Sequence, residues 1–177
     1  PTPVVSSAAS DVYKRQSLTC INPGFVLGDF LNEKTSTSME YAKQLLQGKY
    51  PAAPKFSVMI SHVKDVAKAH VLSLSNKKAG GRRLIVGSEV RSILELSKIM
   101  AKNIPSHAKK LPKRELPNFM VKLISYIDTS AKTMVPDLGL KMQTDQTYAE
   151  DILQIKFTAS EIAVVDAAKS LIRLNLA

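Results

Sequence analysis

The chain has 177 residues, of which 45% are hydrophobic and 23% charged, and its formal net charge is +10. This length is sufficient for one domain with a hydrophobic core, and the composition is ordinary for a globular protein. No apolar run approaches the roughly 18 residues of a membrane helix, and no secretory signal is visible at the start. The single cysteine, Cys20, excludes a disulfide framework. These features favour a cytoplasmic protein that does not bind membranes.

Residues 1–16 differ from the rest of the chain because they are small and polar and show no hydrophobic periodicity. We interpret them as a non-native or disordered leader, which implies truncation upstream, and we assign the fold to residues 17–177.

The most informative stretch is Leu18 to Asp29, which begins as an apolar, β-branched run and reaches Asn22-Pro23-Gly24. Proline donates no ladder hydrogen bond and glycine adopts backbone angles that other residues avoid. The pattern predicts a buried strand that breaks sharply, followed by a loop that reopens at Gly28. In open α/β sheets, ligands bind beyond the carboxyl ends of the strands, so this break is a candidate ligand site. A simple turn remains the alternative.

Further elements follow from local signals. Extended stretches are predicted at 56–63 and 82–86. Gly48 has the position of a helix C′ residue. Three pairs have the spacing of a capping box, which predicts that a helix begins at each: Thr37 and Glu40, Ser92 and Glu95, Thr158 and Glu161.

The helix that follows Ser61 to Val63 is predicted to begin with Asp65 as its cap. Its inner face is predicted to carry Ala67, His70, Val71 and Leu74. On this face His70 is interpreted as a packed core residue rather than a ligand.

A later helix has the clearest apolar stripe of the chain, with Pro117 in its first turn. This stripe favours either a lid over a substrate pocket or ordinary core packing. Its residues are Phe119, Met120, Leu123, Ile124 and Ile127.

The positive charge is densest from His107 to Arg114. A basic cluster can bind nucleic acid, but no aromatic residues are interleaved here, and no recognised nucleic-acid motif is present. We therefore expect a solvated loop and no nucleic-acid partner. No metal site is expected, because the three histidines and Cys20 lack ligand spacing.

Four segments occur in a characteristic order: Leu18 to Asp29, Ser61 to Val71, Gly81 to Val86, and Ala167 to Leu174. Together they resemble the C-terminal half of the extended short-chain dehydrogenase/reductases. This is the NAD-dependent epimerase/dehydratase superfamily, and the dihydroflavonol-reductase-like and aldehyde-reductase-like branch is the most similar.

The resemblance implies an α/β fold, consisting of the C-terminal part of a Rossmann-like doubly wound domain with a mostly helical substrate-binding lobe. It implies a fragment of an oxidoreductase that uses NADP or NAD to reduce a small carbonyl compound, such as an aldehyde, a ketone or a dihydroflavonol-like molecule. By the same resemblance Pro23, Gly24, Phe25 and Val26 border the nicotinamide, and Ser38 contacts the cofactor. Asp65 matches an acidic residue that we interpret as structural.

Two features of such reductases are missing from the chain. Its seven glycines never form the glycine-rich turn that receives a pyrophosphate. The family's catalytic tyrosine, which is followed by a lysine four residues later, is also absent. The five tyrosines, Tyr13, Tyr41, Tyr50, Tyr126 and Tyr148, are followed at that spacing by Ser, Leu, Pro, Ser and Ile. We therefore assign no catalytic residue and expect the chain alone to be inactive.

Two other functions remain open. One is a non-catalytic protein of the same fold that senses a dinucleotide, and the other is a basic nucleic-acid-binding module.

Overall fold

The computed structural model describes residues 17–30, 36–124, 126, 135–140 and 142–177. The predicted leader and Ile127 of the predicted apolar stripe lie outside these residues.

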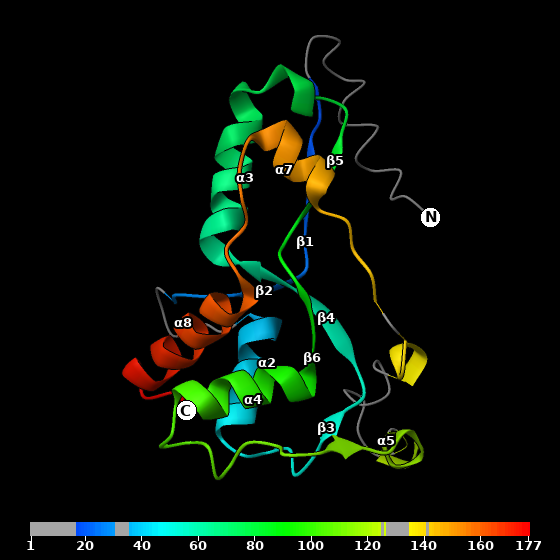
Figure 1. Ribbon diagram of the computed structural model, residues 1–177, viewed down its shortest axis with the longest axis vertical. Helices are drawn as coiled ribbons and strands as arrows, with labels where there is room; N and C mark the ends of the chain where they lie inside the picture. The colour runs from blue at the N-terminus through cyan, green and yellow to red at the C-terminus, as the bar shows by residue number, and fades with distance from the viewer. Residues whose placement is uncertain (1–16, 31–35, 125, 127–134, 141) are drawn as a thin grey trace.

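The described residues form two parts (Figure 1). In the upper part of the figure, β1 (Cys20–Pro23) pairs in parallel with β5 (Arg83–Val86). Two α-helices, α3 (Val63–Ser75) and α7 (Thr147–Leu153), pack against this pair, and η1 (Lys77–Ala79) precedes β5. The predicted strand is therefore present, but it is half-buried to exposed rather than buried, and it includes Pro23.

The lower part is built on a three-stranded sheet in the order β2 (Phe25–Leu27), β4 (Ser57–His62), β6 (Val90–Ser92). The chain therefore enters another strand directly after Gly24, and not the predicted loop. Three helices accompany this sheet: α2 (Thr37–Leu46), α4 (Ile93–Asn103) and α8 (Ser160–Arg173). At its far end lie β3 (Ala53–Pro54) paired with β7 (Glu115–Leu116), then α5 (Asn118–Ile124) and η2 (Val135–Asp137).

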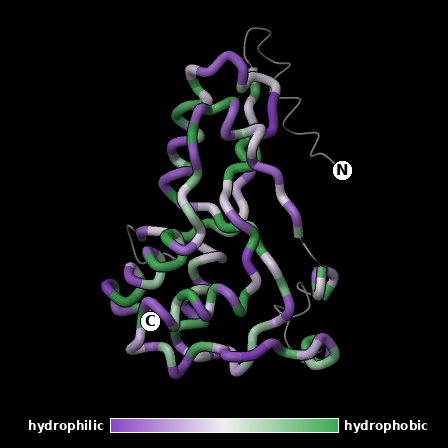
Figure 2. Tube along the Cα trace, viewed as in Figure 1, coloured by the Kyte–Doolittle hydropathy of each residue, from purple (hydrophilic) through white to green (hydrophobic). Residues whose placement is uncertain are grey.

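Each part has its own hydrophobic core. The upper core includes Leu84, Val86 and Phe157, and the lower one includes Ile60, Leu96 and Leu171. Figure 2 shows hydrophobic and hydrophilic stretches alternating along the helices of both parts, as expected for helices that bury one face. The α/β fold with parallel strands confirms the predicted fold class.

Two of the predicted signals at helix ends are confirmed. Ser92 and Glu95 form the predicted capping box, in which the Glu95 N–H donates to Ser92 Oγ (3.2 Å) and the Ser92 N–H donates to Glu95 Oε2 (2.7 Å). The bond from the Ser92 N–H is the largest of the influences that lower the pKa of the Glu95 carboxyl. Gly48 ends α2 with a φ of 78°, and the Lys49 N–H donates to the Gln44 carbonyl (3.0 Å).

Two of the predicted capping boxes are wrong. The N-cap of α2 is Ser36, whose hydroxyl accepts from the Met39 N–H (3.4 Å), and Thr37 is the first helical residue. The N-cap of α8 is Ala159, which offers no side-chain bond. There the Ser160 N–H donates instead to the carboxylate of Glu89 (2.8 Å).

The predicted inner face of α3 is also wrong. Val71 and Leu74 are 65% and 87% exposed, and His70 is exposed with its Nδ1 2.8 Å from the Val66 carbonyl oxygen. The face that packs on β1, β5 and α7 carries Ala69, which is fully buried, flanked by Val66 and Leu72.

The stripe on α5 is not a core face in the described residues. Phe119 and Leu123 are 70% and 67% exposed, whereas Val121 is buried, at 3%. Pro117 precedes the helix rather than lying in its first turn, and its carbonyl accepts from the Met120 N–H (3.0 Å).

None of the helices in the described ranges is long and apolar enough to cross a membrane. Across the same ranges, no cluster of three or more His, Cys, Asp or Glu side chains is arranged to hold a metal ion.

The capping assignments predict unequal effects of two similar substitutions. Ser92→Ala removes a hydrogen-bonded cap and should lower the free energy of unfolding by about 1 kcal/mol. Thr37→Ala removes a hydroxyl that does not cap α2, so it should change the free energy by less than about 0.5 kcal/mol. Urea unfolding of the two variants measures the difference, and an equal loss in both would contradict the assigned N-caps.

Candidate cofactor-facing site

The candidate site lies where the chain passes from one part to the other. β1 ends at Pro23, which pairs with Val86 at the end of β5, and both strands run in the same direction. The next residues, Gly24 and Gly87, each pass close to the backbone of β4. A Cβ on Gly24 would lie 2.3 Å from the Met59 carbonyl oxygen, and one on Gly87 would lie 2.9 Å from that of Ile60.

This contact gives Gly24 a structural reason to be glycine. No side chain fits between its Cα and β4, whatever binds on the other side. The backbone at Gly24 is therefore closely approached, and the group that approaches it is the main chain of β4. Pro23 and Gly24 are nevertheless exposed, at the carboxyl end of β1.

Ser61 joins the two parts at this point. It is fully buried on β4, where its hydroxyl accepts from the Gly24 N–H (2.8 Å) and donates to the Val86 carbonyl (2.6 Å). Each bond reaches a different parallel strand end. Ser61 lies within Val58 to His62, which is buried throughout. A buried serine requires hydrogen-bond partners, so a serine in a strand predicted to be buried is the signal that could have identified it.

Phe25 and Val26 continue from Gly24 as β2, in parallel register with Ile60 and Ser61. Both side chains are half-buried. The Phe25 ring meets the ring of Tyr41 edge-to-face, with centroids 6.1 Å apart, and Tyr41 in turn stacks on Tyr50 at 5.2 Å. The segment therefore rests on an aromatic layer formed by Tyr41 of α2 and by Tyr50, which follows that helix.

Ser38 lies on α2, one turn before Tyr41, and is half-buried. The structure thus places it on the helix that supports Phe25, but it shows no hydrogen bond between Ser38 and Pro23 to Val26 among the described residues. Four of the five predicted cofactor residues are contiguous, and the fifth is on a neighbouring element.

Tyr41 is a residue that the sequence did not single out. Its hydroxyl is buried and has no hydrogen-bond partner in the described part of the chain. Burial raises the pKa of this hydroxyl, and the neighbouring Tyr50 raises it further. Tyr41 therefore stays neutral and acts as packing beneath Phe25.

Asp65 does not cap α3. The N-cap is His62, whose Nδ1 accepts from the Lys64 N–H (3.1 Å), leaving Nε2 to face Asp166 Oδ2 at 3.4 Å. Asp65 is buried at 8%, and its two oxygens accept from the N–H and the hydroxyl of Thr158, at 2.7 and 3.1 Å. It therefore fixes the segment that leads into α8, so its role is structural but at a different helix.

A second carboxylate, that of Glu89, binds the chain at Ser160, two residues after Thr158. Glu89 accepts from the Ser160 N–H, and Arg91 Nε donates to Ser160 Oγ (2.9 Å). Partial burial, the largest single influence, would raise the pKa of Glu89, but several hydrogen bonds, the strongest of them from Ser160, together outweigh it and hold that pKa below its ordinary value. Asp65 and Glu89 together anchor the start of α8 from both parts of the molecule.

The site offers exposed backbone and a supported aromatic ring at the carboxyl ends of parallel strands. Its residues Pro23 to Val26 have no titratable side chain, so they can border and orient a flat ligand but cannot move a proton.

The sequence is similar over part of its length to plant reductases. It is 32% identical over 94 residues to tetraketide alpha-pyrone reductase 2 of Arabidopsis thaliana. The matched stretch covers 53% of this chain and 29% of that protein. It is 34% identical over 89 residues to a cinnamoyl-CoA reductase of Medicago truncatula, covering 50% and 27%. The resemblance to the extended short-chain dehydrogenase/reductases is confirmed. No protein-family model matches the chain.

Solved structures show the same fold. A yeast methylglyoxal/isovaleraldehyde reductase complexed with NADPH matches 97% of this chain and 47% of its own, with a TM-score of 0.70 and 19% identity. A nucleoside-diphosphate-sugar epimerase from Pseudomonas aeruginosa matches 97% and 54%, with a TM-score of 0.73 and 13% identity. The chain therefore spans about half the length of these structures, and the sequence matches span under a third of the curated relatives.

The contact of Gly24 with β4 predicts that Gly24→Ala destabilises the protein with no ligand present. The added Cβ must push Met59 aside, which should cost about 1 to 3 kcal/mol, as overpacking does. Pro23→Ala, at the exposed neighbouring residue, should change the free energy of unfolding by less than about 0.5 kcal/mol. Chemical unfolding of both variants tests this, and an unchanged Gly24→Ala would show that β4 does not restrict the position.

The bonds of Asp65 predict a second pattern. Asp65→Ala leaves the Thr158 N–H without its acceptor and should cost about 2 kcal/mol, whereas Asp65→Asn keeps one acceptor oxygen and should cost about half as much. In a double-mutant cycle with Thr158→Val, the two losses should be non-additive by at least about 0.5 kcal/mol. Strict additivity would contradict the assigned contact between Asp65 and Thr158.

Proposed function

We propose that this chain is the C-terminal portion of an NAD(P)-dependent reductase that acts on a carbonyl group of a small molecule. One observation carries the proposal: the exposed residues Pro23 and Gly24 lie at the carboxyl end of β1, the side of the strands where α/β folds bind their ligands. The relatives support it, since one is named an NADPH-dependent methylglyoxal reductase and solved neighbours contain NADPH or NAD.

In this proposal Pro23 to Val26 border the nicotinamide, and Ser38 lies nearby on α2. The nicotinamide supplies the hydride when it is bound. The backbone from Pro23 to Val26 limits the position of the ring from one side, because Ser61 and Met59 leave that backbone no freedom to move toward β4. The Phe25 ring, held by Tyr41, excludes water from the same side.

An aldehyde, a ketone or a dihydroflavonol-like compound fits the branch that the chain resembles. The group that protonates the reduced oxygen belongs, in this proposal, to a tyrosine with a lysine four residues later. That pair lies outside these 177 residues.

The proposal predicts a difference between two proteins. The full-length protein that contains this chain should oxidise NADPH or NADH when a carbonyl substrate such as methylglyoxal is added. The 177-residue chain alone should not, because it has neither the proton-donating pair nor the pyrophosphate turn. Carbonyl-dependent oxidation of NADPH or NADH by the isolated chain would contradict the proposal that the proton-donating pair lies outside it.

Within the full-length protein, Phe25→Ala should weaken NAD(P)H binding by about tenfold, equivalent to about 1.4 kcal/mol. Leu74→Ala is the matched control, because Leu74 is 87% exposed on α3, and it should leave binding unchanged. Fluorescence titration of the nucleotide measures both. A full-length protein that binds dinucleotide but shows no carbonyl reduction would instead favour a dinucleotide sensor.

A further inference from the structure

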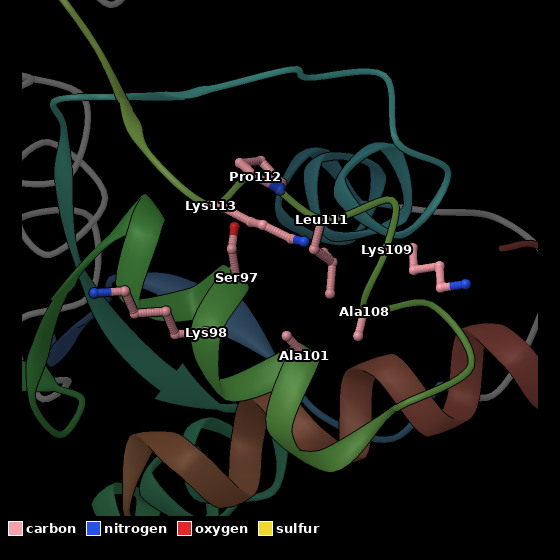
Figure 3. Close-up of a pocket in the computed structure, with 8 residues that line it drawn as sticks. All are labelled: Ser97, Lys98, Ala101, Ala108, Lys109, Leu111, Pro112 and Lys113. Carbon is pink, nitrogen blue, oxygen red and sulfur yellow. The ribbon is translucent and has the colours of Figure 1, made fainter.

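The basic segment from His107 to Arg114 has no part in the proposed reductase site, and it borders a hollow of about 370 Å³ against α4. The hollow is lined by Ser97, Lys98, Ala101, Ala108, Lys109, Leu111, Pro112 and Lys113. Figure 3 shows Ala101 and Ala108 on opposite sides of it, with Leu111 between the loop and the helix. The walls are therefore largely apolar side chains, and Leu111 is 3% exposed.

The three lysines of the lining are not equivalent. In Figure 3 the Lys113 side chain extends toward Leu111, which also lines the hollow. Lys98 and Lys109 extend away from the hollow on opposite sides. Lys113 is therefore the cation that an occupant of the hollow would meet.

No carboxylate lines the hollow. Within the described residues, the structure shows an ion pair for Lys102, to Glu161 at 3.5 Å, but none for Lys109 or Lys113. Lys98 has Glu95 as a charged neighbour and is one of the influences that lower the pKa of Glu95. Among the described residues, no carboxylate of the lining and no ion pair neutralises Lys113.

A cation beside apolar walls favours a ligand that has a negatively charged group and an apolar part. Desolvating a charge is costly unless an opposite charge pairs with it, and the potential of neighbouring lysines attracts anions to such a concave surface. We propose that this hollow binds a small amphipathic anion, with its carboxylate or phosphate head at Lys113 and a short apolar body against Ala101, Ala108 and Leu111.

The geometry favours this ligand over nucleic acid. A single-stranded nucleic-acid site combines a basic groove with aromatic side chains on which bases stack. No aromatic residue lines this hollow. Its lysines also diverge in Figure 3 rather than follow one groove.

The test is calorimetric titration of the 177-residue chain with octanoate and with octyl phosphate at low salt, with octylammonium as the charge-reversed probe. Octanoate or octyl phosphate should bind, and octylammonium should bind at least about tenfold more weakly. The comparison of the two heads identifies which anion the hollow prefers. Equal binding of octylammonium, or no binding of either anion, would overturn the proposal.

Two lysine variants with the same change in net charge localise the head. Lys113→Gln should weaken binding of the preferred anion by about tenfold, whereas Lys109→Gln should change it by less than about twofold. Equal losses in the two lysine variants would reveal a diffuse charge effect and overturn the site.

Ala108→Phe, which fills the hollow, should abolish binding while the melting temperature shows that the chain still folds. Binding of single-stranded RNA that Lys109→Gln and Lys113→Gln weaken equally would show a nucleic-acid surface instead.

Discussion

The buried hydroxyl of Ser61 is the interaction on which the arrangement of the two parts depends. Through two hydrogen bonds it connects the end of β1, at Gly24, with the end of β5, at Val86, and it does so from β4 of the other sheet. A hydroxyl with one donor and a free lone pair suits this position, because it satisfies a backbone N–H and a backbone carbonyl at once. The glycines that follow both strand ends let their backbones approach β4 closely enough for these bonds.

This crossing determines what the candidate site can present. Because Gly24 is pressed against Met59, its remaining face and that of Pro23 are turned outward. Phe25 and Val26 then continue in register with β4, so their positions follow from the same contact. The site is a consequence of how two small sheets meet, and it does not require a flexible loop.

The start of α8 is held by a related device. Asp65, on the helix of the upper part, and Glu89, beside the lower sheet, accept hydrogen bonds from Thr158 and Ser160. Neither residue belongs to α8, so the helix has no cap of its own and depends on the two parts being in place. Charge-assisted hydrogen bonds of this kind are stronger than neutral ones.

The features that the sequence predicted correctly depend on residues that are close in the chain. The Ser92–Glu95 box and the end of α2 at Gly48 are examples, since the interacting groups are separated by three to five residues. The predicted inner face of α3 was wrong because two different sets of residues on this helix have the spacing of a buried face. Packing on β1, β5 and α7 selects the stripe of Ala69 over that of Val71.

The candidate site divides in the same way. Pro23 to Val26 could be recognised from a short motif, whereas the partners of Ser61 and Asp65 lie 25 to 93 residues away. A carboxylate that precedes an apolar helix face has the local sequence pattern of an N-cap. That pattern is the same when the carboxylate accepts a hydrogen bond from a distant N–H instead. Only the tertiary arrangement shows that His62 caps α3 and that Asp65 is free to hold Thr158.

Amide hydrogen exchange at Gly24 tests the central claim most directly, because Gly24 is exposed and its N–H has Ser61 Oγ as its acceptor. We expect the Gly24 amide of the wild-type chain to exchange at least about a hundredfold more slowly than in an unstructured peptide, and Ser61→Ala to remove most of this protection. A Gly24 amide that exchanges at the unstructured rate in the wild-type chain would contradict the account.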